Sequence, residues 1–407
     1  MLVELCPHAH ARYTSLPLVG PHLEGLVVWL VGRGYPRLCI RRRLSAMPRL
    51  EMRLHRRGVG RLEDLCDSEL LRFAPRHVRD DVSLSAAVRS ITRYLDEHGL
   101  LARPELTASG QLIVDYRRHL DRVRGLSAKT LELHSATAAA LLSFLNFDRD
   151  QAALQNLGSS QIEAFIRATS DRLSRESLQH AVAYVRSFLR FLAGRSEVRA
   201  DLHNVIDTPR VYRQERLPRA LAWPAVQAFL AAIDRSTAMG RRDHTMFLLM
   251  ATYGLRASEV ATLRLDDIDW RAEKIRVPRP KTGTPLELPL TDEVGAAFVD
   301  YLRHARPQSL CREVFLRLRL PARRIRPTTV GEAFRTWARR GGLPTGCGGP
   351  HCLRHSLAVH LLREGLSLKS IGDLLGHRST ESTCVYLRLQ VEDLRDAGLP
   401  LPSEVSR

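Results

Sequence analysis

Residues 243–263, DHTMFLLMATYGLRASEVATL, contain the turn on which the predicted fold depends. One set of apolar side chains recurs at the three- and four-residue spacing of a buried helix face: Met246, Leu249, Met250 and Tyr253. Gly254 follows this set, at a position where a left-handed residue ends a helix. A second helix fits residues 257–263. The stretch therefore predicts two consecutive helices, with Arg256 in the turn between them.

The surrounding region, residues 216–400, is predicted to combine helices with a small β-sheet. Strands fit residues 274–277 and 286–290, and Lys281-Thr282-Gly283 supplies turn-forming residues between them. Helical spacing returns after the second strand, and the helices expected there span residues 328–340, 351–363, 368–375 and 381–389.

Residues 106–197 are predicted to form an all-α domain. The stripe of a helix with one buried face is formed by Leu178, Val182, Val185, Leu189 and Leu192. Helices also fit residues 112–120 and 130–145, and no alternating strand pattern interrupts them. Residues 198–215 contain several arginines and no sustained period, so they are predicted to be a basic linker.

Residues 1–105 are rich in arginine: ten arginines lie between Arg33 and Arg61, interleaved with leucines. This mixture predicts basic amphipathic helices, whose charged side chains either face solvent or contact DNA phosphates. Gly34-Tyr35-Pro36 and Gly125-Leu126-Ser127 each precede a helical stretch. We therefore consider residues 1–105 an extra helical region and a degenerate second copy of the domain that follows, with chance similarity as the alternative.

The chain is strongly basic, because 62 lysines and arginines against 44 aspartates and glutamates give a net charge of +18. Such an excess attracts polyanions, so nucleic acid is the first partner expected. The alternatives are a membrane surface and no specific partner at all. No N-terminal stretch resembles a targeting signal, and the apolar run at residues 26–31 is too short to span a bilayer. We expect a cytoplasmic protein that associates with DNA and not with membranes.

The seven cysteines are scattered, odd in number and without a C-x-x-C pair, a pattern that does not indicate a disulfide framework. His351, Cys352 and His355 lie near Cys347, which requires zinc to be considered. Their spacing matches no standard zinc-ligand pattern, and no second pair of ligands accompanies them. We expect no metal site and no cofactor.

Five motifs in residues 216–400 contain groups that can hold a phosphate: Thr252-Tyr253-Gly254-Leu255-Arg256-Ala257-Ser258-Glu259, Pro280-Lys281-Thr282-Gly283, His351-Cys352-Leu353-Arg354-His355, Leu374-Leu375-Gly376-His377-Arg378-Ser379 and Tyr386. In order and wording they resemble the motifs of the tyrosine recombinases, the phage integrase family. The resemblance also covers residues 106–197, which are similar to the family's SAM-like helical core-binding domain. It implies a mostly α fold, with a small β-sheet in the mixed α/β catalytic domain.

The resemblance implies a complete catalytic set: Arg256, Lys281, His351, Arg354, His377 and Tyr386. Tyr386 would attack the phosphorus and become an O-(3′-phospho-DNA)-tyrosine, while the two arginines stabilise the charge of the transition state. His351 would accept the tyrosine proton, and Lys281 would protonate the 5′-oxygen that leaves. His377 would hydrogen-bond a non-bridging oxygen, and Glu259 is expected to orient a cationic neighbour.

The function implied is that of a site-specific DNA recombinase or integrase that needs neither metal nor ATP. It would act on double-stranded DNA as a homotetramer, with related recombinases as further partners, in integration, excision, transposition or resolution. A type IB topoisomerase shares this chemistry. A DNA-binding factor without catalysis and a metal-dependent transposase are alternatives from other classes. The motif Gly376-His377-Arg378-Ser379 and the helical residues 106–197 favour the recombinase.

Overall fold

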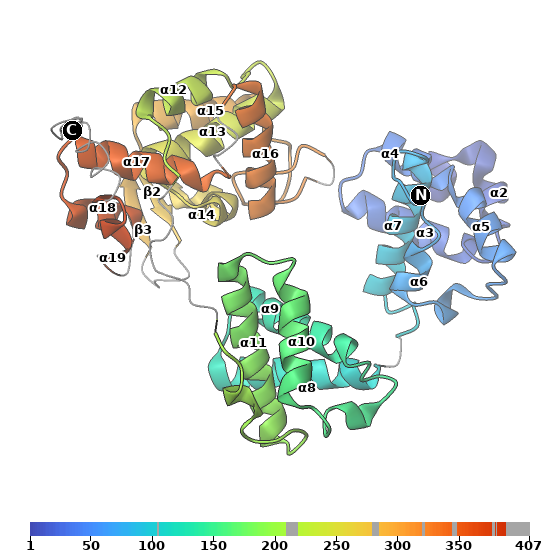
Figure 1. The fold of residues 1–407 in the computed structure, drawn as a ribbon. Coiled ribbons are helices and arrows are strands. Elements are labelled where there is room, and N and C mark those ends of the chain that lie inside the picture. The colour runs from blue at the N-terminus through green and yellow to red at the C-terminus, as the bar shows by residue number, and fades with distance from the viewer. Residues whose placement is uncertain are drawn as a thin grey trace, which may run out of the picture. The chain divides into compact units, whose positions relative to one another are not determined.

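The computed structural model describes residues 1–103, 106–208, 219–278, 285–319, 322–343, 348–376, 379 and 381–387. They form mostly helices and one small antiparallel sheet, which confirms the predicted fold class (Figure 1). The chain divides into two compact units, one comprising Met1–Leu101 with Arg216–Arg407, the other Ala102–Glu215. None of the helices in the described ranges is both long and apolar enough to cross a lipid bilayer.

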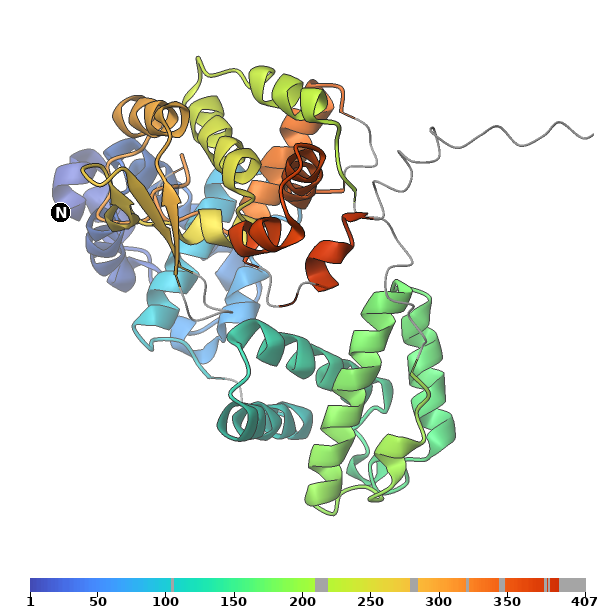
Figure 2. The same cartoon turned by 90° about the vertical axis from the view of Figure 1, so that its left-hand side faces the viewer.

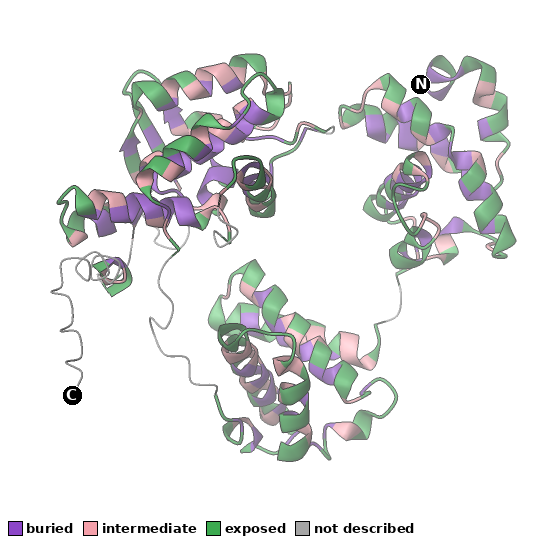
Figure 3. Ribbon diagram, turned by 45° about the horizontal axis from the view of Figure 1, so that its top comes forward, coloured by how far each residue is buried: buried purple, intermediate pink, exposed green. Residues whose placement is uncertain are grey.

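Residues 1–101 fold into short helices around a core of their own. The helices are α1 (Leu2–Leu5), α2 (His10–Thr14), α3 (Gly20–Gly32), α4 (Arg37–Leu44), α5 (Met47–Arg56), α6 (Asp67–Leu71) and α7 (Val82–Glu97), with 3-10 turns η1 (Pro7–Ala9) and η2 (Leu62–Asp64). Their buried faces, purple in Figure 3, contribute Leu23, Leu30, Ile40, Leu50 and Val88 to this core. The predicted basic amphipathic helices are α4 and α5, which bury apolar side chains and expose most of their arginines.

The unit Ala102–Glu215 is a bundle of helices. It contains α8 (Ala108–Arg124), α9 (Ala128–Phe144), α10 (Ser159–Ser170) and α11 (Arg175–Gly194), with 3-10 turns η3 (Gln151–Ala153) and η4 (Leu202–Asn204). Gly125 ends α8 in the left-handed conformation, and the Ser127 hydroxyl group accepts the Thr130 N–H at the start of α9. The helices predicted here are confirmed, and most of the predicted stripe on α11 is buried.

The C-terminal part of the first unit, described from residue 219 onward, contains the sheet. Its elements are α12 (Trp223–Ala231), α13 (Ala238–Tyr253), α14 (Ala257–Thr262), the 3-10 turn η5 (Leu265–Asp267), β1 (Ile268–Asp269), β2 (Lys274–Val277), β3 (Leu286–Pro289), α15 (Asp292–His304), α16 (Pro327–Arg340), α17 (His351–Arg363), α18 (Leu368–Leu375) and α19 (Glu381–Cys384). The strands have the order β1-β2-β3 and pair antiparallel (Figure 2). Ile275 on β2 lies opposite Ile268 on one side and Leu288 on the other, and all three are buried.

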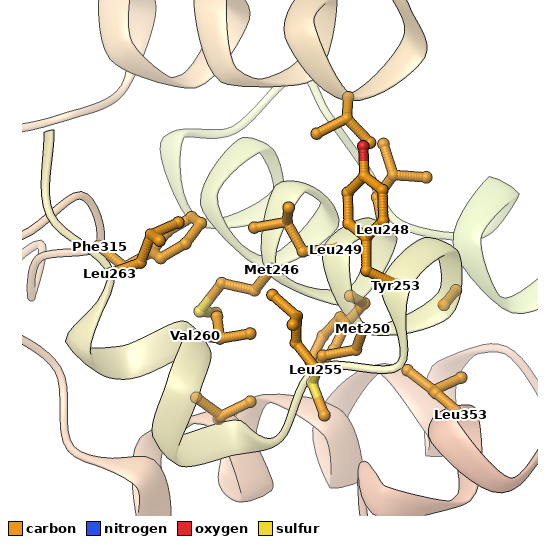
Figure 4. Packing of buried hydrophobic residues seen from close by; sticks show 14 of the residues in the cluster. Met246, Leu248, Leu249, Met250, Tyr253, Leu255, Val260, Leu263, Phe315 and Leu353 are labelled. Atoms are coloured by element: carbon orange, nitrogen blue, oxygen red, sulfur yellow. The ribbon is translucent and has the colours of Figure 1, made fainter. Parts of the chain in front are cut away.

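Helix α13 is the centre of this core and packs against α15 and α17. Its residues from Thr245 to Ala251 are all buried, so this stretch of the helix is enclosed on every side. Figure 4 shows Met246, Leu249 and Met250 of this stretch among the apolar side chains of the core. The Tyr253 hydroxyl group donates to the Pro289 carbonyl oxygen at 2.5 Å and thereby joins the end of α13 to β3. These contacts fix the position at which α13 ends and the next turn begins.

The predicted pair of helices around Gly254 is confirmed, since α13 ends at Tyr253 and Gly254 has a φ angle of 65°. Of the helix predicted over residues 381–389, residues 388–389 lie outside the described residues, and the rest is interrupted, because α19 ends at Cys384 and a turn at Val385 and Tyr386 follows before Leu387, which is helical again. In that turn the Tyr386 N–H bonds to the Thr383 carbonyl oxygen at 3.0 Å, a tighter pattern than that of an α-helix. The predicted turn at Lys281 and linker residues 209–218 lie outside the described residues.

Candidate active site

The turn after Gly254 positions Arg256 at the start of α14. The Glu259 carboxylate accepts the Arg256 backbone N–H at 2.8 Å and its side-chain Nη1 at 2.7 Å. Glu259 is 5 % exposed, so its oxygens have little contact with water, whereas the Arg256 side chain is 35 % exposed. The buried carboxylate therefore fixes the direction of a guanidinium group that still reaches the surface, as predicted for Glu259.

Arg354 on α17 is buried and bonded to two helix ends. Its Nη1 donates to the Gly254 carbonyl oxygen at 2.6 Å, and its Nη2 donates to the Leu375 carbonyl oxygen at 2.5 Å. Both carbonyl groups lie at helix C-termini, where unpaired carbonyl oxygens and the helix dipole favour a cation. This environment explains how a guanidinium group that is 1 % exposed remains charged.

His351 is the first residue of the same helix. The pKa of its imidazole lies below the ordinary value, first because burial desolvates the ring. In addition, the positive charges of Arg354 and Arg256 disfavour a positive charge on the imidazole. The Glu259 carboxylate raises the pKa and only partly offsets these effects. His351 is therefore neutral at pH 7 and able to accept a proton.

Tyr386 follows α19 and packs into a small apolar cluster with residues of α17 and α18. The members of the cluster are Ala358, Val359, Leu362, Ile371, Leu375 and Tyr386. Burial raises the pKa of the Tyr386 phenol, while the charges of Arg354 and Arg256 lower it and only partly offset that effect. The phenol thus lies within the electrostatic influence of both guanidinium groups, which is the relationship on which the predicted mechanism depends.

His355 connects the tyrosine with the first histidine. Its Nδ1 lies 2.9 Å from the Tyr386 hydroxyl oxygen, a hydrogen-bonding distance. The His355 ring meets the His351 ring edge-on, with centroids 4.5 Å apart. The sequence prediction gave His355 no catalytic role, although its position four residues after His351 indicates that both lie on one helix face.

Four of the six predicted catalytic residues therefore come together: Arg256, His351, Arg354 and Tyr386. The other two, Lys281 and His377, lie outside the described residues. A buried phenol beside two guanidinium groups and two imidazoles can move a proton and stabilise negative charge on an incoming anion.

The residues for which zinc had to be considered, Cys347, His351, Cys352 and His355, lie only partly within the described residues. Cys352 is buried in the core of its unit, and Cys347 lies outside the described residues. Within the described part of the chain, no three histidine, cysteine, aspartate or glutamate side chains form a group that could hold a metal ion.

Two family models match the chain. Residues 221–393 match the phage integrase family, and residues 113–196 match the N-terminal SAM-like domain of phage integrases. A relative from Sinorhizobium fredii, the integrase/recombinase y4rA, whose name is provisional, is 34 % identical over 400 residues. That match covers 96 % of this chain and 97 % of the relative. The chain belongs to the phage integrase family of tyrosine recombinases.

Named recombinases and solved structures agree with this assignment. Tyrosine recombinase XerC of Roseiflexus castenholzii is 32 % identical over 285 residues, which cover 68 % of this chain and 88 % of the relative. A lambda integrase dimer bound to a COC′ core site has a TM-score of 0.54 at 17 % identity and covers 79 % of this chain and 89 % of that one. The XerH post-cleavage complex with palindromic difH has a TM-score of 0.53 at 15 % identity. The match covers 75 % of this chain and 92 % of the XerH chain. The structures support the fold, and the sequence relatives identify a tyrosine-type site-specific recombinase.

Proposed function

We propose that this recombinase cuts and rejoins DNA strands through a 3′-phosphotyrosine at Tyr386, without a metal ion or a nucleotide cofactor. The observation that carries the proposal is that the Tyr386 hydroxyl oxygen lies 2.9 Å from Nδ1 of His355 on α17, the helix that also carries His351 and Arg354, and that Arg354 bonds to the Gly254 backbone two residues before Arg256. In the proposed step the phenolic oxygen forms a bond to phosphorus while the bond from phosphorus to the 5′-oxygen breaks. The new bond conserves the free energy of the phosphodiester, so a 5′-hydroxyl group can reverse the step on another strand.

The two arginines are proposed to stabilise the transition state. Negative charge grows on the phosphate oxygens as the phenol attacks, and fixed cationic groups stabilise that charge more than the ground state. Arg256 can approach a DNA phosphate from the surface while Glu259 holds its other side. Arg354 is buried, so it contributes a positive charge whose position the backbone fixes.

Three further residues complete the proposed chemistry. The lowered pKa of His351 keeps its imidazole neutral at pH 7, as a proton acceptor requires. Lys281 is proposed to protonate the departing 5′-oxygen, and His377 is proposed to hydrogen-bond a non-bridging oxygen. Both of these roles rest on the family resemblance.

The proposed substrate is double-stranded DNA, bound by a homotetramer, with related recombinases as further partners. The net charge of +18 and the DNA complexes of lambda integrase and XerH support the choice of DNA. Residues 106–197 are proposed as the core-binding domain, 198–215 as the linker and 216–400 as the catalytic domain. Residues 1–105 are an additional helical region, and we place the protein on DNA in the cytoplasm.

The test is covalent capture on nicked suicide duplexes, from which the cleaved end is lost so that rejoining cannot occur. Because the target sequence is unknown, the probe is selected from a randomised duplex pool by its capture on the full-length wild-type protein. Peptide mapping should locate the adduct at Tyr386, and Tyr386→Phe should bind the selected duplex without forming an adduct. An adduct of undiminished yield in Tyr386→Phe would refute the assignment.

Two further measurements separate the rival functions. Adduct formation should survive a chelator, whereas a metal-dependent transposase would lose its activity. Exchange of strands between two labelled duplexes is expected of a recombinase, whereas a type IB topoisomerase would relax supercoiled DNA without exchanging partners.

A further inference from the structure

We propose that His355 is a further catalytic residue, which takes the proton of the Tyr386 hydroxyl group as that oxygen attacks the phosphorus. The inference rests on the proposed function and adds a residue to it. Nδ1 of His355 lies 2.9 Å from the Tyr386 hydroxyl oxygen, the reach required of a general base. In this proposal His355 takes the place of His351 as the acceptor of the proton. His351, whose ring contacts the His355 ring with centroids 4.5 Å apart, must stay neutral so that it does not repel the proton that His355 takes up.

Tyr386 needs an acceptor because burial raises the pKa of its phenol. Even an unperturbed tyrosine, with a pKa near ~10, is almost entirely protonated at pH 7. Among the described residues, Arg354 on α17 and Arg256 at the N-cap of α14 act on the Tyr386 phenol, and His351, which Glu259 of α14 influences, contacts the His355 ring. The two arginines favour the phenolate, but their effect does not outweigh burial.

The proposed proton transfer balances in both directions. During cleavage the Tyr386 oxygen gives its proton to Nδ1 of His355 and its electron pair to the new bond to phosphorus. The 5′-oxygen leaves with the electrons of the broken bond and takes a proton from Lys281, as proposed above. During rejoining, the His355 imidazolium returns its proton to the Tyr386 oxygen as that oxygen leaves phosphorus. His355 therefore acts in cleavage and in rejoining.

The same hydrogen bond is open to an opposite interpretation. Tyr386 is 2 % exposed, so DNA reaches its oxygen only after the surrounding segment opens. If His355 served only to hold the phenol inside, its removal would speed cleavage. If His355 takes the proton, its removal slows cleavage. The direction of the change therefore decides between the two interpretations.

The experiment measures single-turnover adduct formation by the full-length protein on the selected suicide duplex between pH 6 and pH 10. His355→Ala and His355→Gln should both slow the reaction by about 10²-fold at pH 7, since neither side chain takes up a proton. The deficit should shrink as the pH rises towards 10, because a growing fraction of the Tyr386 phenol ionises without help. His360→Gln is the matched control, because His360 lies on the same helix but stacks on Trp223, and it should keep the wild-type rate.

A second substrate separates a proton acceptor from a proton donor. A sulfur atom in the 5′-bridging position leaves without protonation, so it should speed Lys281→Ala and leave His355→Gln slow. Wild-type or faster rates in His355→Gln, or its full rescue by the sulfur, would overturn the role of His355 alone. A wild-type adduct at a residue other than Tyr386, or the absence of any adduct, would overturn the proposed function as well. Thermal unfolding and binding of the duplex should show that both His355 variants fold.

Discussion

The Arg354 side chain is bonded to the Gly254 backbone, 100 residues away in the sequence, with its Nη1 2.6 Å from the Gly254 carbonyl oxygen. Its Nη2 holds the Leu375 carbonyl oxygen, so one guanidinium group joins the ends of α13 and α18. A backbone acceptor cannot be displaced by a rotamer change. The charge that is proposed to act on the phosphate is thus fixed by the fold itself.

Arg354→Lys should separate charge from geometry. Lysine keeps the positive charge but cannot span two carbonyl groups with a planar fork. We expect the free energy of unfolding to fall by about 1.5–3 kcal/mol, the worth of one charged hydrogen bond, and adduct formation to slow by about 10²-fold. Urea unfolding and single-turnover capture measure the two effects. Arg363→Lys at the exposed end of the same helix is the control, and an equal loss there would contradict this account.

Gly254→Ala should destabilise the protein for two separable reasons. Gly254 has a φ angle of 65°, and an added Cβ would lie 2.5 Å from Cδ2 of Leu375. Gly342 has a φ angle of 66° with nothing within 4 Å of the added atom, so Gly342→Ala measures the backbone cost alone, about 1 kcal/mol. Urea unfolding of Gly254→Ala should show a loss larger by about 1–3 kcal/mol, because the core is overpacked. Equal losses of unfolding free energy in Gly254→Ala and Gly342→Ala would mean that the Leu375 side chain moves aside without a cost in free energy.

Glu259→Gln tests a positioning residue. The amide still accepts one hydrogen bond from Arg256, but it lacks the charge that strengthens both bonds. We expect adduct formation to slow about tenfold, which corresponds to about 1.4 kcal/mol. Glu259 also raises the pKa of His351, so its neutralisation should move the acidic limb of the pH–rate profile to lower pH. Glu332→Gln on the exposed face of α16 should change neither the rate of adduct formation nor the position of the acidic limb. An unmoved acidic limb in Glu259→Gln would contradict the effect of Glu259 on the pKa of His351.

Local features of the sequence were sufficient to predict most elements near the site. The apolar spacing before Gly254 and the left-handed glycine itself are short-range signals, and both were confirmed. Strand β1 carries no comparable signal, because its two residues, Ile268 and Asp269, are too few to show a period. The helix predicted over residues 381–389 is interrupted at Val385 and Tyr386, where Tyr386 packs against residues of α17 and α18, a contact between distant residues that the local sequence does not indicate.

The contacts that define the site were harder to predict, because they join residues distant in the sequence. His355 and Tyr386 are 31 residues apart, and no pattern in either motif indicates their hydrogen bond. The partners of Arg354 are backbone carbonyl groups, which carry no side-chain signature at all. The family motifs predicted residues that the fold brings together, whereas the partners of each residue required the fold.

The exposed arginines of α4 and α5 allow a test of the N-terminal region. Arg41 and Arg42 of α4, and Arg56 of α5 together with Arg57 directly after it, are all exposed. If they bind phosphates, their joint replacement by alanine should weaken binding of the selected duplex and reduce the salt slope by about 1 for each phosphate that is no longer neutralised. Replacement of the exposed Arg76 and Arg79, outside these helices, is the control for charge alone. The same DNA affinity and salt slope in the wild type and both variants would mean that the arginines of α4 and α5 face solvent or contact a protein partner.

Tyr116 in the helical unit should make the protein sensitive to alkali. Burial raises the pKa of Tyr116 to about 12, and its hydroxyl group lies 2.9 Å from Nδ1 of His134. A raised pKa means that the folded state favours the neutral phenol, so this stabilisation is complete below pH ~10 and is lost as the pH rises towards 12. A shift of about two units corresponds to roughly 2–3 kcal/mol. Tyr116→Phe should unfold more easily than wild type at pH 8, by about 1 kcal/mol for the missing hydrogen bond, yet lose less stability between pH 10 and pH 12. Calorimetry of both full-length proteins across this range measures the difference, and parallel stability curves would show that the buried phenol is not responsible.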